Sequence, residues 1–93
     1  MLTKRAYDER VFHVDMSPVL RRDDSIAAVV AVLGQALADE AEELAITSIS
    51  AHARAVSFRV GGGTALCRYQ LVIQVTTADP AQEIEGVIYL DVQ

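Results

Sequence analysis

The sequence predicts a mostly β-stranded single domain, and three observations predict it. The chain has 93 residues, which is enough for one hydrophobic core and hard to divide between two. Apolar residues make up 52% of the chain and the formal charge is −5, a balance typical of a folded globular protein rather than a disordered one. The second half of the chain alternates apolar and polar residues with a period of two, which indicates half-buried strands.

Three alternating segments lie between residues 54 and 92, at 54–60, 66–77 and 83–92. The apolar residues that share a face are Val56, Phe58 and Val60 in the first segment, Cys67, Tyr69, Leu71, Ile73 and Val75 in the second, and Ile84, Ile88, Leu90 and Val92 in the third. Short turns separate the segments, whereas a parallel return needs a dozen or more residues. The three segments are therefore expected to form an antiparallel meander.

The first quarter of the chain is less regular. Residues 1–8 are polar and of mixed charge, and we expect a flexible N-terminal arm followed by one β-sandwich domain at 9–93. The β-forming run 11–16 predicts a short strand that ends at Pro18, because proline has no N–H for a ladder. Residues 19–22 are expected to form a helical turn with Leu20 pointing inward.

The segment 26–44 allows two interpretations. Its apolar residues follow helical spacings of three and four, and its alanines and glutamates favour a helix. Its valines favour a buried strand instead, and a glycine at position 34 would cost a helix about 1 kcal/mol. In the second interpretation a strand at 25–33 ends at Gly34, a short helical or irregular insert follows near 35–43, and a further strand follows at 44–50. The local pattern leaves both interpretations open.

The glycine run 61–63 does not predict a phosphate site. A P-loop needs a lysine after its last glycine, and Lys4 is the only lysine in the chain. A dinucleotide fingerprint needs a helix after the glycines, whereas an alternating strand follows here. We expect a glycine-rich hairpin turn with positive φ.

No other group of residues predicts a reaction centre. His13, His52 and Cys67 are too few and too far apart in sequence for a metal site, and Cys67 lies on the inward face of a predicted strand. The acidic residues near position 40 lack the alternate spacing and the glycine of a calcium loop, so a solvated face is expected for Asp39, Glu40, Glu42 and Glu43. The sequence thus predicts no catalytic, cofactor-binding or metal-ligating residues, no cofactor and no enzymatic activity.

Charge and hydropathy also predict which partners to exclude. Thirteen acidic residues against eight basic ones argue against nucleic acid, whose binders carry a basic patch. The longest wholly apolar run, 26–33, is far shorter than the about 20 residues of a spanning helix, so no membrane partner is expected. With a single cysteine no intrachain disulfide forms, which fits synthesis in a cytoplasm.

The order of short motifs resembles that of a known family. Phe12, Val14, Asp15, Ser17 and Leu20 precede Asp24-Ser25-Ile26 and an apolar run, and Gly62-Gly63-Thr64, Tyr69, Val75-Thr76-Thr77 and a valine-ended strand follow. This order is similar to that of small phage and prophage virion proteins with an immunoglobulin-like β-sandwich. The chain departs from the family by having no tryptophan, with Met16 where one is usual.

The resemblance implies a fold and a role. The fold would be an antiparallel immunoglobulin-like β-sandwich of about six to seven strands, and it favours the strand interpretation of 26–44. The role would be that of a non-enzymatic structural protein of the virion, made in the bacterial host cytoplasm and contacting capsid, head–tail or tail proteins in the head or head–tail region. A homo-oligomer is possible. The alternative is a small soluble module that binds a peptide or another ligand on a sheet face or edge.

Overall fold

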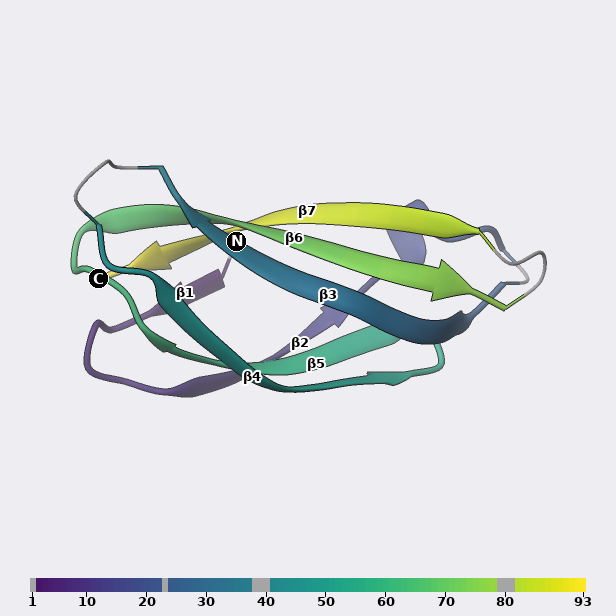
Figure 1. Ribbon diagram of the computed structural model, residues 1–93, viewed down its shortest axis with the longest axis horizontal. Helices are drawn as coiled ribbons and strands as arrows, with labels where there is room; N and C mark the ends of the chain where they lie inside the picture. The colour runs from purple at the N-terminus through teal and green to yellow at the C-terminus, as the bar shows by residue number, and fades with distance from the viewer. Residues whose placement is uncertain (1, 23, 38–40, 79–81) are drawn as a thin grey trace.

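The computed structural model describes residues 2–22, 24–37, 41–78 and 82–93 (Figure 1). Seven strands and one short 3₁₀ helix, η1, make up its regular structure. In chain order these are β1 (Leu2–Lys4), β2 (Arg10–Asp15), η1 (Ser17–Val19), β3 (Ile26–Ala36), β4 (Leu44–His52), β5 (Ala55–Gly62), β6 (Cys67–Thr77) and β7 (Glu83–Val92). The predicted mostly-β class and strand number are confirmed.

The strands form two sheets that face each other as the layers of a sandwich (Figure 1). One sheet has the order β1-β7-β6-β3 and the other the order β2-β5-β4. All pairings are antiparallel except that of β1 with β7. Constant-type immunoglobulin domains place strands one, two, five and four in one sheet and three, six and seven in the other. Strands two to seven are divided in the same way here, whereas β1 lies on the opposite sheet.

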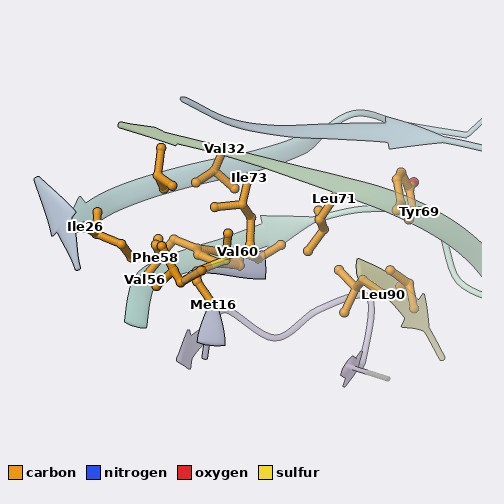
Figure 2. Packing of buried hydrophobic residues seen from close by; sticks show 13 residues of the cluster. Met16, Ile26, Val32, Val56, Phe58, Val60, Tyr69, Leu71, Ile73 and Leu90 are labelled. Carbon is orange, nitrogen blue, oxygen red and sulfur yellow. The ribbon is translucent and has the colours of Figure 1, made fainter. Parts of the chain in front are cut away.

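The core lies between the sheets and includes most of the inner-face residues that the alternation predicts, although Cys67, Ile84 and Ile88 are only partly buried. From Val56 to Val60 in β5 and from Tyr69 to Val75 in β6 every second side chain is fully buried, which fixes the register because a slip by one residue would expose the whole set. Figure 2 shows these side chains meeting between the layers. The largest of the fully buried side chains are Tyr69, Phe58, Leu71, Ile73 and Leu90.

The predicted meander of three strands is wrong at its first connection. β6 and β7 form the expected antiparallel hairpin, with Ile73 opposite Gly86. β5, however, pairs with β2 and β4, so residues 63–66 cross from one sheet to the other. The positive φ expected in the glycine run is confirmed at Gly62 (72°) and Gly63 (92°), but the turn joins two layers rather than a hairpin.

The predicted break at Gly34 is also wrong. β3 continues through Gly34 to Ala36, and it contains no helix. The strand interpretation of residues 26–36 is therefore confirmed. Gly34 has a packing role, because a Cβ there would lie 3.0 Å from Leu44 Cδ1 and 3.2 Å from Ile46 Cδ1. Glycine therefore lets β3 approach β4 closely. Of the predicted insert at 35–43, residues 41–43 are irregular and residues 38–40 lie outside the described part of the chain.

Two predictions in the first quarter need correction. Residues 1–8 are not wholly a flexible arm, because Leu2–Lys4 pair with Leu90–Val92 of β7. The polar residues of this segment gave no sign of a strand, although Leu2–Lys4 form one and its lysine is buried. The helical turn begins earlier than expected, at Ser17, although Leu20 is buried as predicted. No helix in the described ranges is long and apolar enough to cross a membrane.

Candidate interaction surfaces

The residues that sequence patterns singled out do not converge. His13 lies on β2, where its Nδ1 is 2.5 Å from Ser57 Oγ, His52 ends β4, and Cys67 begins β6. Glu42 and Glu43 are exposed, while Asp39 and Glu40 lie outside the described residues. Across 2–22, 24–37, 41–78 and 82–93 no three His, Cys, Asp or Glu side chains are grouped so as to hold a metal ion.

One end of the sandwich is held by the hydroxyl of Tyr69. This hydroxyl donates to the carbonyl of Glu42 (2.5 Å) and accepts from the backbone N–H of Thr64 (2.9 Å). The Thr64 hydroxyl in turn accepts from the N–H of Glu42 (2.8 Å). The three bonds join the loop before β4 to the loop before β6. A strand-six tyrosine bonded to backbone a few residues upstream is also the arrangement of the immunoglobulin tyrosine corner.

Lys4 stabilises the same end of the sandwich. Its side chain is only 2% exposed, and its Nζ donates to the carbonyls of Gly62 (2.6 Å) and Arg5 (2.7 Å). Burial lowers the pKa of the Lys4 amine, and the nearby Asp8 charge opposes that change. Lys4 thereby ties β1 to the glycine turn. The sequence carries no signal for this contact, since a buried lysine is recognised only once its partners are placed.

Arg54 holds the other end. Its guanidinium donates to the carbonyls of Asp24 (2.6 Å) and Arg21 (3.0 Å) and to the hydroxyl of Ser17 (3.0 Å). Ser17 donates from its hydroxyl and its N–H to Asp15 Oδ1, and these bonds lower the pKa of the Asp15 carboxyl. Arg54 thus holds the described part of the β2–β3 connection against the β4–β5 turn.

The outer face of the four-stranded sheet carries an apolar group that we call the outer row: Leu33, Val72, Val87 and Tyr89. Leu33, Val72 and Val87 stand opposite one another across β3, β6 and β7. Leu33 is 52% exposed and Val87 51%. Four contiguous apolar side chains on a face of a small domain are a feature of interaction sites, whereas scattered single ones are ordinary.

Polar pairs flank the outer row on β6 and β7. On one side Gln74 Nε2 donates to Glu85 Oε1 (2.8 Å). On the other side Arg68 Nε donates to Asp91 Oδ1 (2.7 Å), and this bond lowers the pKa of Asp91 and raises that of Arg68. An apolar centre with a polar rim is the usual anatomy of a protein–protein contact.

A pocket of about 200 Å³ lies beside β7, between that strand and the η1 turn. Its lining is mostly apolar and comes from the end of β2, from η1 and from the middle of β6 and β7: Val14, Asp15, Met16, Pro18, Val19, Ile73, Gly86, Val87 and Ile88. The absence of a side chain at Gly86 makes room here for Met16. Nothing in the local sequence pattern predicted this pocket, because its walls come from segments about 70 residues apart.

Comparison with known proteins agrees with a structural role. A family model described as podophage GP4 fiber-tail adaptor protein gp77 matches residues 4–90. The match spans nearly the whole chain and includes all the strands that form the two sheets, apart from the first residues of β1 and the last of β7. No curated protein matches, and no solved structure matches.

Proposed function

Because the chain belongs to the family of podophage GP4 fiber-tail adaptor proteins gp77, a family of phage virion structural proteins, we propose that it joins a tail fibre to the tail by protein–protein contacts and performs no catalysis. The sequence-based expectation is a place in the head or head–tail region of the particle. Because the family is one of fibre–tail adaptors, we assign the proposed contacts to the junction of fibre and tail. The immunoglobulin-like form of the sandwich belongs to the same proposal, supported by the division of strands two to seven and by the Tyr69 corner.

The outer row is the observation that carries the proposal on the structural side. An adaptor must bind two partners at once, so at least one of its sheet faces must be exposed to solvent and not buried in its own core. The outer row supplies apolar area for burial, and the Arg68–Asp91 and Gln74–Glu85 pairs supply a rim that orients the partner. The acidic charge of the chain adds selectivity for partner surfaces of opposite sign.

The test is to replace Leu33 with lysine and to follow fibre attachment. Leu33→Lys places a charge at the β3 end of the outer row without touching the core, because Leu33 is half exposed. Particles assembled with this variant are expected to lose their fibres, as seen by electron microscopy and by mass spectrometry of purified virions.

Ile49→Lys is the matched control. Ile49 is a large apolar residue that is also exposed (41%), but it lies on β4 of the other sheet. Particles with Ile49→Lys are expected to keep their fibres. Absence of the wild-type protein from intact virions would overturn the proposed function, and normal fibre attachment with Leu33→Lys would overturn the assignment of the outer row.

A further inference from the structure

The edge of β7 is only partly covered by another strand. β1 pairs with β7 at Leu90–Val92, and β1 is three residues long. Within the described ranges, residues 83–89 have a partner strand on the β6 side and none on the β1 side. A seven-residue edge therefore continues the strand position that β1 occupies.

Hydrogen bonds at the end of β7 show which backbone groups face this edge. Gln93 donates from its N–H to Lys4 on the β1 side, whereas the Val92 carbonyl accepts from Leu66 on the β6 side. Because successive residues of a strand direct their backbone groups to opposite sides, the odd-numbered residues face outward. The backbone groups on the side without a partner strand are thus those of Glu83, Glu85, Val87 and Tyr89.

The β7 edge differs from the β3 and β4 edges in regularity. β3 pairs with β6 through two register shifts, and β4 pairs with β5 through one, near Ser48, whose φ is 54°. Such irregularities are a usual protection of sheet edges against further pairing. β7 keeps an unbroken register with β6 from Glu83 to Val92. Its edge is regular enough to template another strand.

The pocket beside β7 lies against the same edge. Gly86, Val87 and Ile88 form one wall, and Val14 and Val19 belong to the opposite side. A strand laid along 83–89 would direct every second side chain toward the inner layer, where this pocket has room for an aliphatic group. Backbone pairing combined with a pocket for alternate side chains is the mode of recognition called β-augmentation.

We propose that residues 83–89 accept an extended segment of a partner virion protein as an additional strand, with an aliphatic side chain in the Val14–Val19 pocket and basic side chains facing Glu83 and Glu85. The virion origin of the segment rests on the proposed function, whereas the strand-accepting edge does not. A second copy of this chain is the poorer occupant. It would bring another Glu83 and Glu85 to the seam between two chains that each carry a charge of −5.

The test is a titration of the isotopically labelled full chain with a capped peptide that alternates valine and lysine. A peptide of the same composition, with the valines and lysines in separate blocks, is the control. Amide chemical shifts are expected to change at 83–89 and around the pocket with the alternating peptide and not with the block peptide. Changes centred on β2 or β3, or no changes, would overturn the proposal. Light scattering that shows self-association through 83–89 would overturn the choice of occupant.

Val87→Pro is the decisive variant, because proline removes an outward N–H without removing a bond to β6. It is expected to weaken peptide binding about tenfold or more. Val87→Thr keeps the N–H and the branched side chain, so it is expected to bind as the wild type does. If circular dichroism shows that Val87→Pro disturbs folding, Val19→Asp decides, since it charges the pocket at a residue that is 42% exposed. Unchanged binding in Val19→Asp would overturn the pocket assignment.

The peptide experiment and the virion experiment test the two proposals independently. If the wild-type protein binds no peptide but is present in virions, only the proposal of a strand-accepting edge is overturned. If the protein binds the peptide but is absent from virions, the proposed function is overturned and the proposal of a strand-accepting edge stands.

Discussion

The side chain of Met16 occupies the space in which residue 86 would otherwise carry a Cβ. An ideal Cβ on Gly86 would lie 2.9 Å from Met16 Cε, closer than such atoms approach in proteins, and 3.3 Å from Met16 Sδ, which is a tight contact. Met16 is 2% exposed and links the end of β2 to η1, while Gly86 lies in the middle of β7. This contact between the two sheets therefore sets the width of the pocket beside β7.

Gly86→Val is expected to destabilise the protein by about 1–3 kcal/mol, because the added carbons overpack the site of Met16. The Met16→Ala variant removes the clash, so Gly86→Val is expected to cost less in that background. Urea denaturation of the four proteins of this double-mutant cycle measures the coupling. Equal costs of Gly86→Val in both backgrounds would show that Met16 is not what excludes a side chain at position 86.

Tyr69→Phe is expected to lower the free energy of unfolding by about 1–3 kcal/mol. The change removes only the hydroxyl, and it leaves the Glu42 carbonyl and the Thr64 N–H without this partner. Tyr89→Phe is the matched control, since Tyr89 is 41% exposed on the outer face. Thermal and urea unfolding compare the two variants, and similar losses in both would contradict the role of the Tyr69 hydroxyl.

The Lys4 amine is expected to titrate below its ordinary pKa of 10.5, because burial disfavours its charged form. In the pH range just below 10.5 the unfolded chain then binds more protons than the folded one, so stability rises with pH there. Lys4 is the only lysine, and its side-chain NMR signal can be followed without overlap from others. In Lys4→Met this rise should be absent, and a wild-type titration at or above 10.5 would contradict its burial.

The Asp91 carboxyl is expected to titrate below 3.8, chiefly because Arg68 donates to it, and Arg68→Gln should raise the pKa of Asp91. The contribution of Asp91 to stability is present above pH 3.8 and is lost as the pH falls through its lower folded-state pKa. Both side chains are exposed to solvent, so the effect on stability is small.

Asp15 is the internal control of the same NMR titration. Its pKa is lowered chiefly by the hydrogen bonds from Ser17 and to a smaller extent by the charge of Arg54, so it should stay unchanged in Arg68→Gln. Ser17→Ala should reverse the pattern by raising the pKa of Asp15 alone. A shift of both carboxyls in either variant would point to a general change of fold instead of the two local hydrogen bonds.

The sequence by itself determined which side of β5, β6 and β7 is buried. Between residues 54 and 92 the alternation identifies the inner faces of β5, β6 and β7 residue by residue, because the side-chain period of a strand is two whatever its neighbours are. The positive φ in the glycine turn was also readable from residue types, since it depends on local chemistry.

Apart from the β6–β7 hairpin, which the short turn between the two segments predicted, only the tertiary structure decided which strands are neighbours. Alternation tells a strand which face to bury and not which edge to pair, so β5 and β6 could be placed in different sheets without any change in their pattern. The same limit hid β1, the packing role of Gly34 and the pocket at Gly86, each of which depends on an atom contributed by a distant segment. Long-range contacts override local propensity at these positions.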